Sequence, residues 1–465
     1  MTADHGYEPH PLDARLASLL PRDSLFAVGG RVRDELRADA EGIPLPTKDF
    51  DYVVTGIDLQ TLEHRLQSAT RLDLVGASFS VLKVTLDGMT VDVALPRRER
   101  STGAGHREFA IEAGPHVSLE DDLARRDFRM NMVARALPSG RLVDPFRGEA
   151  DVRARRIDIL RAEAFAEDPL RMLRAAQFAA RFEYAPTEQT RRTMTQMAAA
   201  INTVSAERIA EELTKMLTLS RRPSIGLELM RETGLLAALW PQLLEGYGVE
   251  QNEWHAYDVY HHALATVDAA PAGDLVLRLA ALFHDVGKPR TKDGPRFYGH
   301  ELVGEDLARS MLARFRFSNQ VIGDVAHLVR QHMYSADPNI TDAGIRRFIR
   351  RIGTEHLQRQ FALRLADAIG SGLPRRDNGN EQFEARVWEE VARKPAFSLT
   401  DIAVDGSDVM DIMRRRGLVK RDFRGDARVG EALRWLFEQV TDHPERNERS
   451  RLLALLDEYF DARTA

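Results

Sequence analysis

The sequence of 465 residues contains no cysteine. This absence excludes disulfide bonds, thiolate metal sites and a cysteine nucleophile. There is also no run of about 18 apolar residues, so we expect no membrane-spanning helix. The first residues, MTADHGYEPHPLDARL, carry acidic groups and no apolar segment, unlike a signal peptide. These absences together predict a cytoplasmic protein.

An excess of positive charge is lacking too, because the net charge is −6. Net charge is a poor guide to nucleic-acid binding, which depends on local patches. Residues 413–428, MRRRGLVKRDFRGDAR, hold seven arginines or lysines against two aspartates, and a second basic stretch is IRRFIRRIG at 345–353. Each stretch is equally compatible with an ordinary solvated helix face.

The composition that is present, 43% hydrophobic and 29% charged, is that of a folded chain. The hydrophobic pattern predicts an α+β fold: strands and helices alternate over residues 24–95, with a hairpin turn at Asp87-Gly88. Beyond about residue 150 the pattern is helical, without a convincing strand, and residues 370–382 are the best linker. Since the length favours two to four domains, we expect domains over residues 1–150, 151–250, 251–385 and 386–465.

Two acids one residue apart open the predicted strand in TKDFDYVVTG, residues 47–56. Alternate residues of a strand point to the same face, so Asp49 and Asp51 would lie side by side and repel each other unless a cation lies between them. Asp92, between Val91 and Val93 in the hairpin, is a third carboxylate that would complete such a site or act as a base. Carboxylates that share a site with substrate phosphates favour Mg²⁺.

A glycine pair in VGGRVRD, residues 28–34, follows a predicted strand and opens a predicted helix. The backbone amides of Gly29 and Gly30 can approach an anion there, and Arg33 can neutralise a phosphate. Glycine pairs and D-x-D pairs are each common in turns and strands. Their order here, strand, glycine pair, helix, then an acid pair on the next strand, is much more specific.

That order resembles the polymerase-β-like nucleotidyltransferases. Four further motifs narrow the resemblance to the bacterial class II CCA-adding enzymes, tRNA nucleotidyltransferases related to poly(A) polymerases. The motifs are LEDDLARRDFRMNMVA (119–134), LVDPFRGEADVRARRI (142–157), FAEDPLRMLRAAQFAARF (165–182) and ERIAEELTKML (207–217). The resemblance implies a nucleotidyltransferase head domain with a mixed sheet, followed by helical domains that template the nucleotide and bind tRNA.

The resemblance also implies roles for single residues. Asp49 and Asp51 would hold the catalytic metals, and Arg126 would contact the nucleotide along with Gly30 and Arg33. Asp168 and Arg171 would read the base edge of CTP or ATP from one helix face that also presents Arg174. Many relatives carry an arginine where this chain has Gln177. The glycine-rich segment 97–116 resembles a mobile loop that helps the family switch from C to A addition.

Histidines and aspartates recur at long intervals beyond residue 250. Taken together they resemble the HD-domain metal phosphohydrolases, whose pattern is H…HD…D. The implied ligands are His262, His284, Asp285 and Asp367, with His300 and His332 as added donors for a second ion. Imidazoles combined with carboxylates suit Ni²⁺, Mn²⁺ or Fe²⁺, and Mg²⁺ more weakly.

Two points near this site stay open. His255 and His261 compete with His262 as the first ligand, whereas Lys288 in HDVGK could steady a phosphate. In some family members this domain has phosphatase and 2′,3′-cyclic phosphodiesterase activity.

Alternatives also stay open for the whole chain. It could add only CC or only A, or act as a poly(A) polymerase. From another class, it could be an HD phosphohydrolase whose front half only binds RNA, or a tRNA-binding module without catalysis. Each alternative keeps tRNA or RNA as the partner.

Overall fold

The computed structural model describes residues 9–45, 50–67, 71–74, 81–101, 109–337, 339–374 and 380–464. Across these ranges no helix has the length and apolar character needed to cross a bilayer. The chain forms two compact units. The first contains residues 1–245 with 272–275 and 311–317, and the second contains residues 246–271, 276–310 and 318–465. The four expected domain ranges are finer than this division and stay a prediction.

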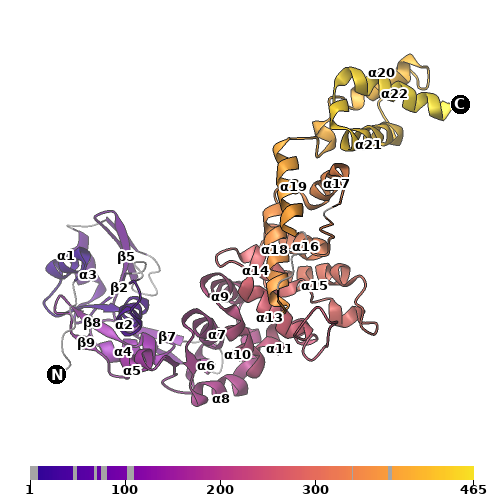
Figure 1. Ribbon diagram of the computed structural model, residues 1–465. Coiled ribbons are helices and arrows are strands. Elements are labelled where there is room, and N and C mark those ends of the chain that lie inside the picture. Colours follow the sequence, from indigo (N-terminus) through magenta and orange to yellow (C-terminus); the bar gives the residue numbers. More distant parts are fainter. Residues whose placement is uncertain are drawn as a thin grey trace. The chain divides into compact units, whose positions relative to one another are not determined.

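The first unit begins with a sheet and its covering helices (Figure 1, indigo to violet). Its strands are β1 (Leu25–Val28), β2 (Asp51–Val54), β3 (Arg71–Leu74), β4 (Val81–Leu86), β5 (Met89–Ala94), β6 (Arg97–Ser101), β7 (Phe109–Ala113), β8 (Ala134–Leu137), β9 (Leu142–Val143), β10 (Arg156–Ile157) and β11 (Ala185–Pro186). Its helices near the sheet are α1 (Pro11–Leu19), α2 (Gly30–Glu41), α3 (Leu59–Gln67), α4 (Leu119–Ala124), the short 3₁₀ helix η1 (Arg129–Asn131) and α5 (Gly148–Arg153).

Apart from β10 and β11, the rest of the described first unit has no strand. It contains α6 (Ala164–Glu167), α7 (Leu170–Phe182), α8 (Glu188–Met197), η2 (Ala198–Thr203), α9 (Ala206–Leu219), α10 (Pro223–Glu232), α11 (Leu235–Leu239) and α12 (Pro241–Leu244). Helix α7 packs between α9 and α10, and eleven of its thirteen residues, Arg171 among them, are buried. Such a helix is positioned by its packing on both sides, because little of its surface can face water.

The described strands of the main sheet are ordered β3-β4-β5-β2-β1-β8-β9. The β4–β5 hairpin forms as expected, with Leu86 opposite Met89. Its turn residues Asp87 and Gly88 both have positive φ, 52° and 81°, which matches the twist of the two strands. The next pair is parallel: β2 lies beside β5, and Asp51 is in register with Asp92. This pairing brings together two acids that are 41 positions apart in the chain.

Two local expectations were incomplete. Beyond residue 150 the structure contains two very short strands, β10 and β11, paired in parallel; two-residue strands leave no periodic signal to detect. The arms of the predicted loop 97–116 are the paired strands β6 and β7, while residues 102–108 lie outside the described residues.

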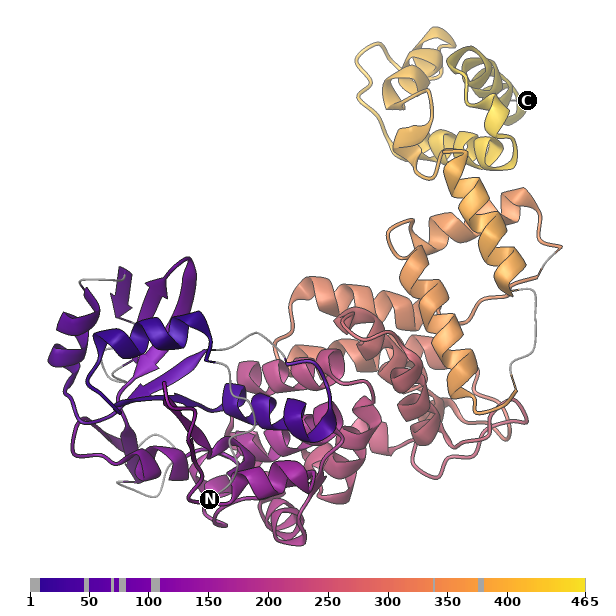
Figure 2. The same ribbon diagram turned by 60° about the vertical axis from the view of Figure 1, so that its left-hand side comes forward.

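The second unit is helical throughout its described residues (Figure 2, salmon to yellow). Its elements are α13 (Val259–Ala269), α14 (Leu275–Phe283), η3 (Lys288–Thr291), α15 (His300–Arg314), α16 (Asn319–Gln331), α17 (Asp342–Ile352), α18 (Leu357–Gly370), α19 (Asn380–Ala392), η4 (Leu399–Asp401), α20 (Gly406–Arg415), α21 (Ala427–Asp442), η5 (Pro444–Arg446) and α22 (Arg449–Thr464). Helices α13 and α18 pack against each other. The predicted ligands His262 and Asp367 lie on α13 and α18, so the packing of these two helices decides whether the ligands meet.

Candidate functional site

The start of α2 brings three predicted residues of the first site together. Gly29 precedes the helix with φ 71°, a backbone conformation that favours glycine. A Cβ atom at this position would lie 2.8 Å from Arg126 Nη1 and 3.7 Å from Asp51 Oδ2. The backbone angle therefore favours glycine here, and the guanidinium group of Arg126 lies close against it. The predicted metal ligand Asp51 and the predicted nucleotide-binding arginine thus share one small region beside the glycine pair.

Arg126 is held there by a residue that sequence reasoning did not single out. The buried carboxylate of Asp122 accepts a hydrogen bond from Arg126 Nη2 at 3.0 Å and from Arg125 Nη2 at 2.8 Å. Burial alone would raise the pKa of Asp122, but the two guanidinium groups lower it below its ordinary value. A permanently ionised carboxylate in this position fixes Arg126. The motif LEDD shows acidic residues at this place in the sequence, but it does not show which of them faces inward.

Helix α7 forms hydrogen bonds with the residues on either side of Arg126. Arg171 Nη2 donates to the backbone carbonyl of Arg125 at 2.6 Å, and Arg174 Nε donates to Asp127 at 2.8 Å. Asp127 is buried, and its pKa is lowered because Arg174 and Asn131 offset the effect of burial. The helix that the resemblance assigns to base recognition therefore also positions the segment that carries Arg126.

The expected common helix face of Asp168, Arg171 and Arg174 is wrong in one respect. Helix α7 begins at Leu170, and Asp168 precedes it with extended backbone angles, φ −144° and ψ 98°. The residue before a proline avoids the helical region, and Pro169 imposes that restriction. The Asp168 carboxylate instead accepts a hydrogen bond from Arg208 at 2.7 Å.

The remaining residues predicted for the first site lie close by. Arg33 is buried, donates to Asn131 Oδ1 at 2.9 Å and lies over the rings of Phe178 and Phe182. A Cβ atom on Gly30 would lie 3.5 Å from Arg33 Nη2. Gln177 is buried, and its amide nitrogen has no hydrogen-bond partner among the described residues.

The acids of the first site are only partly described. Asp49 lies outside the described residues, whereas Asp51 and Asp92 stand on adjacent strands in register. Residues in register on neighbouring strands have side chains on the same face of the sheet. Two carboxylates on one face fit the oxygen-ligand chemistry of Mg²⁺.

The second site is a buried cluster around Asp285, and all of its predicted ligands meet there. One carboxylate oxygen, Oδ2, lies 3.4 Å from His262 Nε2 and 3.2 Å from His284 Nε2. Asp367 Oδ1 lies 3.1 Å from His262 Nε2. The other oxygen, Oδ1, lies 3.3 Å from His300 Nε2 and 3.6 Å from His332 Nε2. Asp285 thus joins two donor groups, His262–His284–Asp367 and His300–His332.

Hydrogen bonds to the backbone fix the orientation of three of these rings. The Nδ1 atoms of His284, His300 and His332 lie 2.9, 2.7 and 2.7 Å from the carbonyl oxygens of Ala281, Phe297 and Val329. In each case Nδ1 must donate, so Nε2 carries the lone pair of the neutral ring. His300 Nε2 and His332 Nε2 are nevertheless only 3.2 Å apart.

Two lone pairs facing each other at that distance require a cation between or beside them. A proton would satisfy the pair, but burial lowers the pKa of His332. The pKa of Asp285 lies well below its ordinary value despite burial, because His284 and Lys288 are close. Despite burial, the carboxylates raise the pKa of His284 to about 10, so a proton or a metal ion compensates their charge. Imidazoles that have lost this proton, together with ionised carboxylates, fit a divalent metal.

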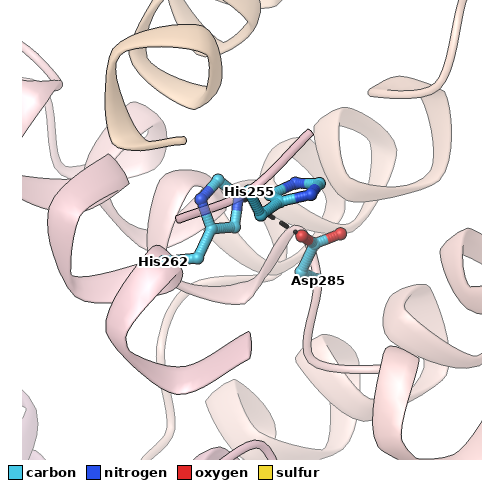
Figure 3. A group of neighbouring side chains, drawn as sticks. All are labelled: His255, His262 and Asp285. Carbon is cyan, nitrogen blue, oxygen red and sulfur yellow. Dashed lines mark ion pairs between the residues drawn. The ribbon is translucent and has the colours of Figure 1, made fainter. Parts of the chain in front are cut away.

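The structure places the three neighbouring histidines, His255, His261 and His262, differently with respect to the cluster. His261 is bonded to Asp258 Oδ1 at 2.8 Å and is not part of the cluster. His262 is fully buried inside it, as expected. His255 adds a further donor at the edge, within reach of His262 and Asp285 (Figure 3). Burial lowers the pKa of His255 to about 4, so its ring is neutral at physiological pH.

A cavity of about 570 Å³ opens onto the cluster and is lined by Asp285, His300, His332 and Asp367 among other residues. Lys288 also lines it, with Nζ 2.6 Å from Asp285 Oδ2 and from Gln251 Oε1. The cluster is therefore accessible to a small molecule, as a catalytic centre requires.

The two basic stretches differ in structure. Arg346, Arg347 and Arg350 of α17 form ion pairs with Glu390, Asp442 and Glu438. Arg346 Nε also donates to the Thr441 carbonyl at 2.5 Å. In the 413–428 stretch, by contrast, no ion pair with a described residue is made by the exposed residues Arg415, Lys420, Arg421 and Arg424. Arg346, Arg347 and Arg350 thus hold helices together, whereas the four exposed residues of the later stretch carry charge that no described carboxylate pairs with.

Comparison with known families divides the chain in the same order as the motifs. The family pattern described as "Poly A polymerase head domain" matches residues 25–158. The pattern described as "Probable RNA and SrmB- binding site of polymerase A" matches residues 183–246. The pattern described as "HD domain" matches residues 255–370, which include all of the histidine cluster.

Whole proteins are similar as well. The multifunctional CCA protein of Cupriavidus necator is 34% identical over 401 residues, covering 83% of this chain and 92% of that protein. The multifunctional CCA protein of Paraburkholderia phytofirmans is 39% identical over 408 residues, covering 84% of this chain and 94% of that protein.

Among solved structures, the Bacillus stearothermophilus CCA-adding enzyme in complex with CTP has a TM-score of 0.71 at 23% identity, covering 98% of this chain and 99% of that one. The Thermotoga maritima CCA-adding enzyme complexed with tRNA has a TM-score of 0.58 at 18% identity, covering 96% and 94%; these two likenesses concern the fold. By its head, RNA-binding and HD domains and by its likeness to whole relatives, the chain belongs to the family of the multifunctional CCA proteins, the CCA-adding tRNA nucleotidyltransferases.

Proposed function

We propose that this enzyme adds all three nucleotides, C, C and A, to the tRNA 3′ end without a nucleic-acid template, using CTP and ATP. The tRNA 3′-hydroxyl attacks the α-phosphate of the bound nucleotide, and pyrophosphate leaves. The observation that carries the proposal is the convergence of Gly29, Asp51 and Arg126 at the start of α2. This is the arrangement that anchors a nucleoside triphosphate next to a metal-binding acid.

The chemistry assigns roles to the chain's own groups. Asp49, Asp51 and Asp92 would hold Mg²⁺, which supplies charge neutralisation at the attacking and leaving oxygens. The amides at Gly29 and Gly30 and the side chain of Arg126 would bind the triphosphate, together with Arg33. Asp168 and Arg171 would read the base edge, with Arg174 beside them.

The test is incorporation of labelled CTP and ATP into three tRNAs that end at the discriminator base, at the first C and at CC. Incorporation into all three in the correct order supports the proposal. Incorporation of C alone, of A alone, or of long A tails would assign one of the narrower alternatives. No metal-dependent incorporation into any tRNA would leave only RNA binding for the first unit.

We also propose that the histidine cluster is a metal-dependent phosphohydrolase centre. The observation that favours it is the 3.2 Å approach of His300 Nε2 and His332 Nε2, both of which carry lone pairs. His262, His284, Asp285 and Asp367 would hold one ion, and Asp285, His300 and His332 a second, with a transition metal preferred over Mg²⁺. The substrate would be a tRNA 3′ end that carries a phosphate or a 2′,3′-cyclic phosphate. Water opens the cyclic phosphate to a monoester, and a second hydrolysis releases inorganic phosphate and leaves the hydroxyl that nucleotide addition needs.

The test has a binding arm and an activity arm. Removal of metal with a chelator should lower the melting temperature of the protein, and added Mn²⁺ or Ni²⁺ should restore it, because a ligand that binds only the folded state stabilises that state. The metal-loaded protein should hydrolyse 2′,3′-cyclic AMP. A melting temperature unaffected by chelator and metal, together with no hydrolysis, would reduce the HD domain to a structural or RNA-binding role.

A further inference from the structure

The cavity beside the histidine cluster has a second wall that the metal ligands do not explain. It is formed by the large side chains of Trp254, Phe297, Tyr298 and Met333. Trp254 is 54% exposed and Tyr298 is 73% exposed. Large aromatic side chains that face water inside a concave site are characteristic of ligand-binding surfaces, because a ligand that covers them gains hydrophobic and stacking energy.

Short connections tie these rings to the cluster. Tyr298 stands two residues before His300, and the carbonyl of Phe297, directly before Tyr298, accepts the hydrogen bond from His300 Nδ1. Trp254 directly precedes His255, and Asn252 Oδ1 accepts from the Trp254 amide at 3.3 Å and lies 3.0 Å from His255 Nδ1. The same backbone segments therefore position both the nitrogen donors and the aromatic rings.

Cations border the aromatic wall. Arg296 and Arg364 line the cavity together with Lys288. The Arg296 guanidinium lies 5.6 Å from the centre of the Tyr298 ring, and that of Arg364 lies 5.3 Å from the centre of the Tyr334 ring. The cavity thus combines positive charge, which suits a phosphate, with flat apolar surfaces, which suit a planar ring.

We propose that Trp254 and Tyr298 form a base-binding subsite of the HD centre, so that the centre selects nucleoside phosphates, including an RNA 3′ end, over simple phosphate esters. This inference rests on the proposed phosphohydrolase function and adds the residues that determine its specificity. The phosphate lies at the cluster while the base stacks on the aromatic wall. A cavity of about 570 Å³ falls within the usual range for small-ligand sites, which leaves room for both parts.

The test compares two substrates that differ in the base. Adenosine 3′-monophosphate carries one, whereas glycerol 2-phosphate is a secondary phosphate ester with neighbouring hydroxyls and no ring. Trp254→Leu and Tyr298→Leu remove the rings but keep the sites apolar. Each should raise KM for the nucleotide about 5- to 100-fold, the range expected for one lost stacking ring, and change kcat/KM for glycerol 2-phosphate less than about twofold. Tyr257→Leu, an exposed aromatic residue close in sequence to Trp254 and outside the cavity lining, serves as the matched control.

A binding measurement separates this inference from the function beneath it. Titration of metal-free protein with adenosine 3′-monophosphate, followed by calorimetry, should show weaker binding in the two variants than in the parent and in Tyr257→Leu. If the parent hydrolyses neither substrate, the phosphohydrolase proposal fails. The calorimetry alone then shows whether Trp254 and Tyr298 bind the nucleotide. Equal losses on both substrates, or unchanged nucleotide binding in both variants, would overturn the subsite.

Discussion

The histidine cluster and the first site, around Asp51 and Arg126, arrange their functional groups differently. In the cluster, His262, His284 and Asp285 are almost wholly buried, and backbone carbonyls fix three of the rings. At the first site, Asp51 and Asp92 are only partly buried. Arg126 is held by an ion pair with Asp122 of α4, while α7 contacts its neighbours Arg125 and Asp127. In the cluster the burial falls on the proposed metal ligands, whereas the first site would have to stay accessible because its proposed function exchanges a nucleoside triphosphate at each addition.

Removing the carboxylate shared by both halves of the cluster gives the largest expected effect. Asp285→Asn should lower hydrolysis of 2′,3′-cyclic AMP by at least about 10³-fold, a loss comparable with removal of a principal catalytic group. CCA addition should remain within about twofold of the parent rate. Steady-state assays of both activities on one preparation measure the contrast. A parallel fall in both would show that the two sites are not independent.

The corresponding change at the first site is Asp51→Asn. The loss of one group that stabilises charge in the transition state should lower nucleotide incorporation about 10²- to 10³-fold. Hydrolysis at the cluster should be unaffected. Incorporation of labelled CTP into tRNA lacking its CCA end measures the first effect. Full incorporation by the variant would contradict the assignment of Asp51 as a metal ligand.

A smaller effect should follow from loosening the support of Arg126. Arg174→Lys keeps the positive charge but loses the paired hydrogen bonds to Asp127, whose two contacts are 2.7 and 2.8 Å long. We expect incorporation to fall about 10- to 100-fold, the usual cost of disturbing a supporting residue. Arg191→Lys, on α8 and paired with Glu232, is the matched control. An unchanged KM for both CTP and ATP would mean that α7 does not position the nucleotide site.

The smallest effect is expected from the two basic stretches, and it tests which of them contacts RNA. Arg421→Ala with Arg424→Ala should weaken tRNA binding and reduce the salt dependence by about 0.7 to 0.9 per lost phosphate contact. Arg347→Ala removes a residue paired with Asp442 and should leave the salt dependence unchanged. Filter binding at several salt concentrations measures both. The reverse result would assign the RNA contact to α17.

Sequence patterns predicted local structure well where it depends on neighbours in the chain. The β4–β5 hairpin formed at Asp87-Gly88, because that dipeptide readily adopts positive φ. Helix α2 begins at the glycine pair as expected, because Gly29 adopts the positive φ that precedes it. The common helix face of Asp168 and Arg171 was predicted wrongly, because spacing was weighed and the restriction imposed by Pro169 was not.

Contacts between distant residues could not be predicted in this way. Nothing in LEDD identifies Asp122 as the acid that faces inward to hold Arg126. Nothing in IRRFIRRIG distinguishes arginines paired across helices from arginines that face solvent, since both patterns are equally charged. Deciding between them requires the packing of α17 against α21.

The sequence alone determined the class of this protein: its motifs and their order specify a nucleotidyltransferase head followed by an HD domain. It also determined which residue types are available for metal binding, since a chain without cysteine must use imidazoles and carboxylates. Only the tertiary structure decided that His262 rather than His261 enters the cluster, and that the lone pairs of His300 and His332 face each other. The reason is that helical periodicity limits which neighbours share a face, whereas the approach of two helices is set by packing between segments that are remote in sequence.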